Sequence, residues 1–145
     1  MSRKGRDFRK NTYYHIYNRG NNKAKVFREP DDKRIFLDFL YKYNREYKIR
    51  IEAYCIMESH FHLVIKTGVC PYKLSLLMQR FMTTYCMYIN RKYKRVGHVF
   101  QGRYNAKPID SDDGLTRVKE YLLENPVKAG LVQHAQDYKW TRVCP

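Results

Sequence analysis

Two β-type runs with almost nothing between them set the strongest constraint on how this chain folds. Residues 50–57 (RIEAYCIM) and 61–67 (FHLVIKT) are rich in β-branched and aromatic side chains, which favours strands. Glu58 and Ser59 lie in the connection, and a connection this short predicts a tight hairpin. Two neighbouring strands of one sheet are therefore expected near the middle of the chain.

Amphipathic helical segments flank this hairpin on both sides. The first begins at Pro30, and Asp31 and Asp32 follow in its first turn, where the helix dipole favours acids. Its apolar residues recur at helical spacing: Phe36, Phe39, Leu40, Tyr43 and Tyr47. The second begins at Pro71 and carries the longest apolar stripe: Leu74, Leu77, Met78, Phe81, Tyr85 and Tyr88. Each helix is expected to bury one face.

Two further strands complete a known arrangement. Residues 13–19 (YYHIYNR) predict a first strand, and Gly20 begins the loop after it. Residues 100–109 predict a loop that enters a fourth strand, with Pro108 near its end or on an edge. The order strand, helix, strand, strand, helix, strand is the ferredoxin-like α+β arrangement. We expect residues 1–145 to form one such domain.

A third helix is predicted after the fourth strand. Ser111 is a good N-cap, and two aspartates follow it. The buried stripe of this helix is expected to be Leu115, Val118 and Leu122. Pro126 is predicted to end the helix near Asn125. This helix is an addition to the ferredoxin-like fold, and that fold serves too many functions to define one by itself.

The charge of the chain indicates a polyanionic partner. Lys and Arg total 29 against 14 acidic residues, so the formal net charge is +15. Such an excess disfavours the compact state through self-repulsion unless a polyanion binds. Nucleic acid is the first candidate and an anionic membrane surface the second. The 14 tyrosines favour nucleic acid, because an aromatic ring that stacks on a base contributes about 1–3 kcal/mol.

Cysteine spacing and hydropathy indicate a reducing cytoplasm. The four cysteines form no Cys-x-x-Cys pair, which argues against a zinc knuckle and a disulfide scaffold: Cys55, Cys70, Cys86 and Cys144. The basic N-terminal residues are followed by no apolar stretch of the kind that a secretory signal needs. No segment approaches the roughly 20 apolar residues of a membrane helix.

The tripeptide His60-Phe61-His62 opens the third predicted strand. Side chains alternate across a strand, so the two imidazoles share one face while Phe61 points to the core. Two adjacent imidazoles on a rigid strand can bind one divalent cation. A pair of histidines is an incomplete metal site, so further ligands must come from elsewhere. A structural or surface role for the pair is the alternative.

Tyr121 and Asn125 lie one turn apart on the third predicted helix. Both are placed beside the apolar stripe, so Tyr121 can reach the boundary between helix and sheet where the histidines point. Asn125 offers an oxygen as a metal ligand, and Arg117 could steady a phosphate. A tyrosine hydroxyl has a reference pKa of about 10 and is a weak nucleophile until it is activated. A metal that polarises a phosphoryl oxygen would let it attack in line.

Several segments together resemble one family. Residues 54–67 (YCIMESHFHLVIKT) resemble the HUH region of single-tyrosine transposases, in which two histidines flank a hydrophobic residue. Residues 121–131 (YLLENPVKAGL) resemble the tyrosine helix of the REP-associated branch. Residues 14–20 (YHIYNRG) and 99–104 (VFQGRY) are similar to the first strand and the loop before the last strand. The resemblance covers nearly the whole chain, in the right order.

The resemblance implies a specific reaction. It implies cleavage and rejoining of single-stranded DNA at imperfect hairpins through a 5′-phosphotyrosine, by a prokaryotic, nucleoid-associated enzyme that needs no membrane. Tyr121 would be the nucleophile, and His60, His62 and Asn125 would be metal ligands. The implied metal is magnesium or manganese, and manganese suits imidazole better. Glu58-Ser59 departs from the Pro-Asn of many relatives. Relatives are monomers or homodimers, and the sequence leaves this open.

Basic residues outside the predicted site are candidates for DNA contact. Arg3, Lys4 and Arg6 form a basic N-terminal arm. Such groups bind phosphates with salt-dependent affinity and without sequence information. A solvated charged face is the alternative. The further predicted contacts, with Arg117, are Arg19, Arg91, Lys92, Lys94, Arg95, Arg103 and Tyr104. His15, His98 and His134 receive no role, and His15 is expected to be structural or to contact DNA.

Two other functions fit the same fold. A non-catalytic nucleic-acid module would bind DNA in the presence of chelator and form no covalent adduct. A metal-independent RNA endonuclease would use His60 or His62 as acid or base and would require a 2′-hydroxyl, so DNA would survive.

Overall fold

Five antiparallel strands form one sheet in the order β4-β1-β3-β2-β5. The computed structural model describes residues 6–145. The strands are β1 (Tyr13–Arg19), β2 (Arg50–Ile56), β3 (His60–Lys66), β4 (Asn105–Ile109) and β5 (Thr141–Val143). The helices are α1 (Pro30–Tyr47), α2 (Tyr72–Lys92) and α3 (Asp112–Lys128), with short 3-10 turns η1 (Asn21–Lys23) and η2 (Ala135–Asp137).

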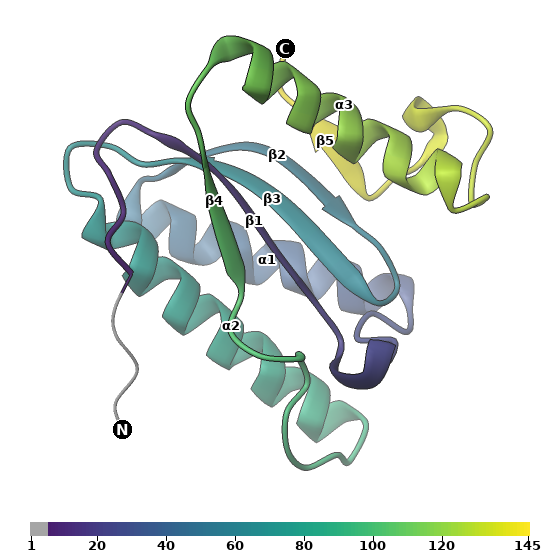
Figure 1. Ribbon diagram of the computed structural model, residues 1–145. Coiled ribbons are helices and arrows are strands. Elements are labelled where there is room, and N and C mark those ends of the chain that lie inside the picture. The colour runs from purple at the N-terminus through teal and green to yellow at the C-terminus, as the bar shows by residue number, and fades with distance from the viewer. Residues whose placement is uncertain (1–5) are drawn as a thin grey trace.

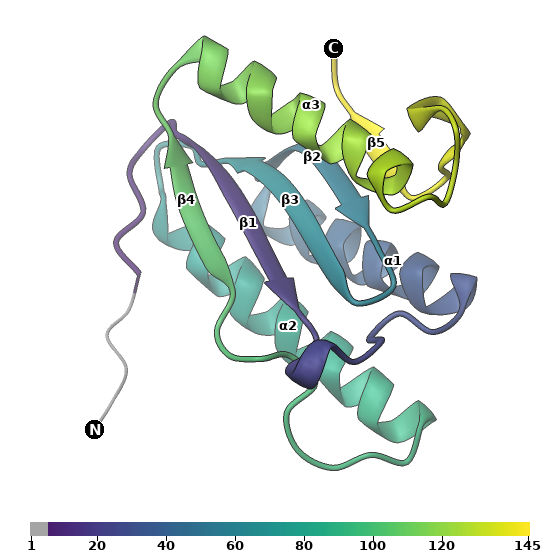
Figure 2. The ribbon, with the colours of Figure 1, turned by 45° about the vertical axis from the view of Figure 1, so that its right-hand side comes forward.

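The expected ferredoxin-like arrangement is confirmed. The first four strands and the first two helices follow the predicted order, and the hairpin of β2 and β3 occupies the middle of the sheet. Figure 2 shows the sheet from β4 at one edge to β5 at the other. Sequence patterns did not predict β5, in which three residues of the tail pair with β2 at an otherwise open edge. β4, with Pro108 in it, forms the opposite edge.

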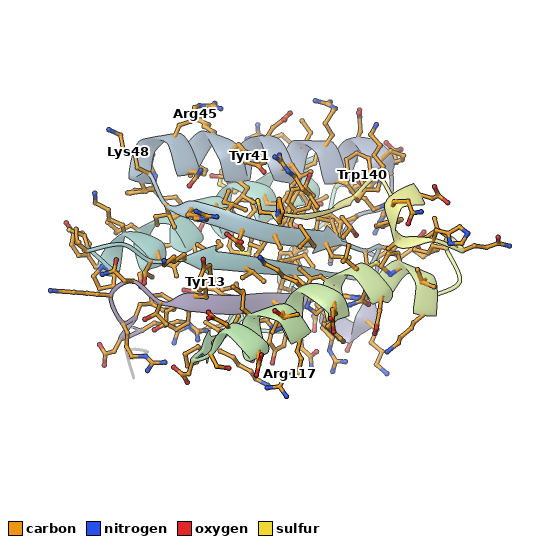
Figure 3. All side chains as sticks on the ribbon, turned by 90° about the horizontal axis from the view of Figure 1, so that it is seen from above. Tyr13, Tyr41, Arg45, Lys48, Arg117 and Trp140 are labelled. Atoms are coloured by element: carbon orange, nitrogen blue, oxygen red, sulfur yellow. The ribbon has the colours of Figure 1, made fainter. Side chains whose placement is uncertain are left out.

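The two faces of the sheet carry different helices. α1 and α2 lie on one face and α3 lies across the other, as Figure 1 shows from the front and Figure 3 from above. Alternate residues of β3 serve the two layers: Phe61, Leu63 and Ile65 join the core under α1 and α2, whereas Val64 packs toward α3. Leu122 of α3 is fully buried in this smaller second layer. His60 and His62 therefore lie on the face of the thinner layer, which α3 covers.

A buried carboxylate joins α1 to α2. Asp32 is fully buried and accepts hydrogen bonds from Lys92 Nζ (2.7 Å), Tyr88 Oη (3.0 Å) and Tyr93 Oη. Burial alone would raise the pKa of Asp32, but these hydrogen bonds outweigh it and lower that pKa. Asp32 also completes a capping box with Glu29 at the start of α1. The side chain of Lys92 thus has a structural role.

The prediction that Pro126 ends α3 near Asn125 is wrong. α3 continues through Pro126 to Lys128. In the last turn a proline removes only the hydrogen bond of its own missing N–H, so the loss is local. The helical hydrogen bond after the proline is formed: the backbone N–H of Ala129 donates to the carbonyl of Asn125. Gly130 then adopts a positive φ of 75° and terminates the helix.

Candidate active site

The two histidines of β3 lie on the sheet face that α3 covers. Their ring centroids are 5.3 Å apart and the rings are nearly perpendicular. Phe61 between them is fully buried in the opposite layer, as the strand alternation predicted. His62 is 6% exposed, whereas His60 is half-buried. One strand thus presents two imidazoles side by side while its other face remains core.

The ring of Tyr121 rests edge-on against the imidazole of His62. Their centroids are 5.4 Å apart, and the angle between the rings is 88°. Tyr121 is nevertheless 47% exposed, so its ring borders both the protein and solvent. The predicted approach of the tyrosine helix to the histidines therefore occurs within a single chain. No second copy is needed to bring these groups together.

His15 of β1 is part of the same cluster, although sequence patterns gave it no role. Its Nε2 lies 3.0 Å from Nδ1 of His62, within hydrogen-bonding distance. Its ring lies 6.2 Å from the ring of Tyr121. Tyr17, two residues on, stacks on His62 at 5.8 Å. The sequence does contain a signal for the position of His15. The ferredoxin-like order places β1 beside β3, and strand alternation then places His15 near His62.

All three imidazoles are held in the neutral form at neutral pH. Burial, and then the neighbouring His15 and His60, lower the pKa of His62 to about 3. Burial, and then the charge of Lys107, lower the pKa of His15 to about 4. Burial also lowers the pKa of His60, although a hydrogen bond with Asn125 opposes the shift. Neutral imidazole is the form that binds metals.

Asn125 meets His60 at the end of α3, as the sequence predicted for a common site. Its side chain hydrogen-bonds the His60 ring, while its buried Nδ2 has no partner among the described residues. The oxygen and nitrogen of an amide exchange places when the group turns by 180°. After such a turn, the side-chain oxygen of Asn125 would occupy the position of the unpartnered Nδ2. That oxygen would then be free to bind a metal.

The residues present therefore fit a divalent cation bound by neutral donors. Two imidazole nitrogens and one amide oxygen would form the set: His60, His62 and Asn125. Among residues 6–145, no three His, Cys, Asp or Glu side chains lie together in a way that could hold a metal ion. Carboxylates are thus no part of this donor set, and the remaining positions would be open to water or phosphate oxygens.

A cleft of about 560 Å³ opens beside these groups. His60, His62 and Tyr121 form part of its wall, and Arg19 and Arg103 bring positive charge to it. Arg19 hydrogen-bonds Gln101, another lining residue, which ties the end of β1 to the loop before β4. An anionic substrate that enters this cleft would meet the tyrosine and both histidines.

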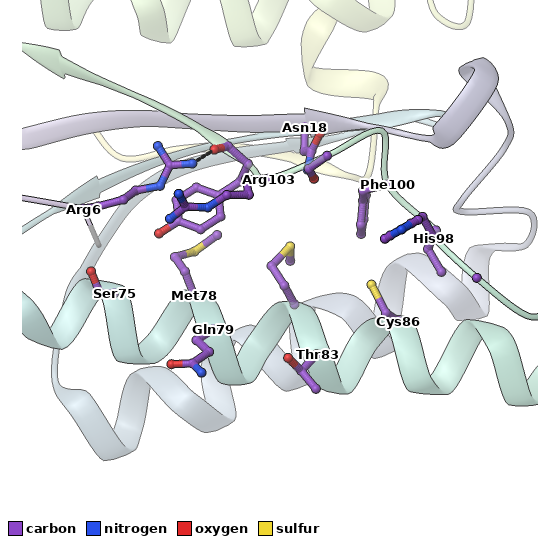
Figure 4. A pocket seen from close by; sticks show the side chains of 15 residues that line it. Arg6, Asn18, Ser75, Met78, Gln79, Thr83, Cys86, His98, Phe100 and Arg103 are labelled. Atoms are coloured by element: carbon purple, nitrogen blue, oxygen red, sulfur yellow. Dashed lines mark hydrogen bonds between the residues drawn. The ribbon is translucent and has the colours of Figure 1, made fainter. Parts of the chain in front are cut away.

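A second groove of about 590 Å³ lies on the other side of that loop, between α2 and residues 97–104. Figure 4 shows Cys86 of α2 near Phe100 at one end of the groove, and Met78 of α2 near Arg103 and Arg6 at the other. The guanidinium of Arg6 stacks on the ring of Tyr104 at 4.2 Å. The cleft and the groove share Asn18, Gly102 and Arg103 as lining residues, so the two are contiguous.

The predicted DNA contacts fall into different environments. Arg6, Arg103 and Tyr104 line the groove, and Arg19 and Arg103 line the cleft. Arg91 and Lys94 are exposed and Arg95 is half-buried at the end of α2, while Lys92 is bound to Asp32 and Glu29. Arg117 is exposed on the outer side of α3 (Figure 3). Arg3 and Lys4 lie outside the described residues.

A buried ion pair anchors the helix that carries Tyr121. Lys119 of α3 donates to the Glu52 carboxylate of β2 at 2.7 Å, and Glu52 is 2% exposed. Burial would raise the pKa of Glu52, but hydrogen bonds from Lys119 and Arg50 outweigh it and lower that pKa. Ser111 caps the start of α3 by accepting from the backbone N–H of Gly114. The position of Tyr121 is thus fixed from the sheet.

The paired histidines and a tyrosine on an added helix, together on a ferredoxin-like sheet, define the single-tyrosine transposase class. The sequence profile of the family described as Transposase IS200 like matches residues 8–125. The chain belongs to this family. It is therefore a DNA-cleaving transposase, which favours this hypothesis over the RNA endonuclease and the non-catalytic module. Families of this kind generally use a divalent metal.

Solved structures share the fold at low sequence identity. One is a REP-associated tyrosine transposase bound to a REP hairpin, with a TM-score of 0.73 and 17% identity over 97% of this chain and 82% of that chain. Another is a candidate transposase from Deinococcus radiodurans R1, with a TM-score of 0.51 and 15% identity over 86% and 97% of the two chains. Comparison with curated proteins gave no match. No helix within residues 6–145 is long and apolar enough to cross a membrane.

Replacing Lys119 with Met should loosen the attachment of α3. The substitution leaves Glu52 buried with only the exposed Arg50 as an ion-pair partner, so we expect a loss of about 2–3 kcal/mol in the free energy of unfolding. Urea denaturation monitored by circular dichroism measures this loss. Lys128→Met, which removes an exposed i,i+4 pair with Glu124 from the same helix, is the control. Equal losses in both variants would contradict the anchoring role.

Proposed function

We propose that this protein cleaves and rejoins single-stranded DNA beside hairpins, with Tyr121 as nucleophile and His60, His62 and Asn125 as metal ligands. The observation that carries the proposal is the edge-on contact between the Tyr121 ring and His62. It joins a partly exposed phenol to a pair of neutral imidazoles within one chain. A monomer can therefore contain the complete site.

The reaction is a transesterification. The hydroxyl oxygen of Tyr121 forms a bond to phosphorus, and the bond from phosphorus to the 3′ oxygen breaks. The phenol loses its proton and the departing 3′ oxygen gains one, so a 5′-phosphotyrosine and a 3′-hydroxyl result. Because one ester replaces another, the bond energy is kept for rejoining and no nucleotide cofactor is required. Reversal by a different 3′-hydroxyl transfers the strand.

We infer that the cofactor is magnesium or manganese, and manganese is the better match for a donor set with two imidazoles. When bound, the cation supplies charge that polarises a phosphoryl oxygen. His60 and His62 offer nitrogen donors from a rigid strand, and Asn125 offers an amide oxygen from the helix of the nucleophile. Because Asn125 and Tyr121 lie on the same helix, the position of one proposed metal ligand is tied to the position of the proposed nucleophile. Arg19 and Arg103 in the same cleft would attract the phosphates on either side of the scissile bond.

The contiguous groove supports a path for the DNA strand. Arg103 lines both hollows, and Arg6 lies at the groove side of the loop. The floor of the groove has sulfur and aromatic side chains that suit a base, while the arginines suit phosphates. A hairpin as the partner is supported by the resemblance in fold to the transposase bound to a REP hairpin.

Tyr121→Phe should abolish cleavage while hairpin binding persists. The substitution removes only the attacking oxygen, so we expect the cleavage rate to fall by more than about 1,000-fold. Labelled hairpin DNA is incubated with Mn²⁺ and resolved on a denaturing gel, where the wild type gives a protein–DNA band that resists boiling. Tyr41→Phe, on α1 at the opposite face of the sheet, should retain the band. A Tyr121→Phe protein that still forms the band would refute this nucleophile.

His60→Ala should remove metal-dependent cleavage. Loss of one of three proposed ligands weakens metal binding, and we expect cleavage at fixed Mn²⁺ to fall by at least about 100-fold. A titration of cleavage rate against Mn²⁺ concentration measures the effect, with EDTA added to the wild type as a reference. His134→Ala, an exposed histidine in the tail, is the control. Unchanged activity of His60→Ala at every metal concentration would exclude His60 as a ligand.

Arg103→Ala should weaken DNA binding in a salt-dependent manner. If its guanidinium binds a phosphate, the slope of log affinity against log salt should decrease in magnitude by about 1. Fluorescence anisotropy with hairpin DNA over a range of salt concentrations gives this slope. Arg34→Ala, on the exposed surface of α1, should leave it unchanged. Identical slopes for the wild type and Arg103→Ala would remove Arg103 from the DNA path.

A further inference from the structure

His15 is a half-buried partner of a proposed metal ligand. Its Nε2 and the Nδ1 of His62 are 3.0 Å apart, so one of the two nitrogens must carry the shared proton. The contact is partly buried on the sheet face that α3 covers, and it comes from two neighbouring strands, β1 and β3. Such a hydrogen bond between imidazoles fixes the orientation of both rings. It also constrains which nitrogen of His62 is available to a metal.

Only one of the two proton arrangements permits metal binding by His62. If His15 donates, the remaining proton of neutral His62 sits on Nε2 and blocks that atom. If His62 donates from Nδ1, its Nε2 keeps a lone pair for a metal. His60 is held in a similar way, since its Nδ1 lies 3.4 Å from the Oγ of Ser59. The Nδ1 side of the His62 ring is therefore occupied by His15, which leaves Nε2 of His62 as the ligand atom.

We propose that His15 is a positioning residue that accepts the Nδ1 proton of His62 and so holds Nε2 of His62 ready for the metal. Metal ligands of this type usually donate their second N–H to a carboxylate or a carbonyl. Here a neutral imidazole takes that place. The role rests on the proposed function as far as the metal is concerned, whereas the shared proton is a property of the metal-free protein.

A neutral acceptor suits a site that must receive a phosphate. A carboxylate behind His62 would add negative charge next to the anionic substrate and would oppose its approach. Lys107, the residue opposite His15 on β4, keeps the local charge positive. The ring of His15 also lies 6.2 Å from that of Tyr121, so the same side chain supports the nucleophile. His15 thereby connects the ligand strand to the tyrosine helix.

The proton positions can be read directly by nitrogen NMR of the metal-free protein. Two-bond ¹H–¹⁵N correlations distinguish a protonated ring nitrogen from an unprotonated one. The chain has five histidines, so single substitutions assign the signals. We expect His62 protonated on Nδ1 and His15 unprotonated on Nε2. In His15→Phe, which keeps a ring beside Tyr121 but removes the acceptor, His62 should change to the Nε2-protonated form.

Metal affinity gives a second readout that needs neither DNA nor catalysis. Mn²⁺ binding, followed by electron paramagnetic resonance, should be about 10–100-fold weaker in His15→Phe than in the wild type. His15→Gln, whose amide oxygen can accept the same proton, should recover a large part of the affinity. His134→Phe, which changes an exposed histidine of the tail, should bind Mn²⁺ as the wild type does.

The two hypotheses fail in different ways. Wild-type His62 protonated on Nε2, or equal Mn²⁺ affinity in the wild type and His15→Phe, would overturn the role of His15. A wild-type protein that binds no Mn²⁺, with His62 protonated on Nδ1, would instead contradict the metal in the proposed function and leave the hydrogen-bond assignment standing. If His15→Phe does not fold, two other measurements test the role of His15. They are the Mn²⁺ affinity of His15→Gln against the wild type, and the protonation of His62 in the wild-type spectrum.

Discussion

The alternation of side chains along β3 is the constraint on which the rest of the structure depends. One strand must fill the core with Phe61, Leu63 and Ile65 and present His60 and His62 on its other face. Because the strand lies in the middle of the sheet and is hydrogen-bonded on both sides, its register cannot slip without exposing the core. The positions of the two imidazoles are thus secured by the same burial that stabilises the fold.

The second layer of the protein is thinner than the first and is built differently. α1 and α2 cover their face with a large aromatic core, whereas α3 contributes two buried residues, Leu122 and Pro126, and an ion pair from Lys119 to Glu52. Tyr121 lines an open cleft on this side of the sheet. An added helix on the open face of a ferredoxin-like sheet therefore both covers that face and carries Tyr121, the proposed nucleophile.

Local sequence patterns predicted most of the fold. The aromatic, β-rich composition of residues 13–19 gave the bounds of β1 without error, and Pro30 and Pro71 gave the starts of α1 and α2 to within a residue. Tyr121 and His62 were expected to meet, and they do. Each of these predictions depends on the composition, the spacing or the proline placement of a single element, which a chain displays directly in its residues.

The features that were missed depend on contacts between distant segments. β5 has three residues and exists because β2 offers an open edge, so its own sequence gives no signal. His15 joins the site only because β1 pairs with β3. Pro126 stays helical because the last turn tolerates one lost hydrogen bond. The sequence predicts a DNA contact for Lys92, together with the basic residues that follow it. In the structure, Lys92 is bound to Asp32, which is far away in sequence.

In the proposed reaction, the Tyr121 hydroxyl and the histidine pair converge on one phosphorus atom. The most direct test is mass spectrometry of the tryptic peptides from the boiled protein–DNA complex. Cleavage after Lys119 and Lys128 yields a peptide whose only tyrosine is Tyr121. We predict that this peptide carries the mass of a 5′-phosphorylated nucleotide. A nucleotide on any other peptide, such as the one containing Tyr17, would contradict the assignment.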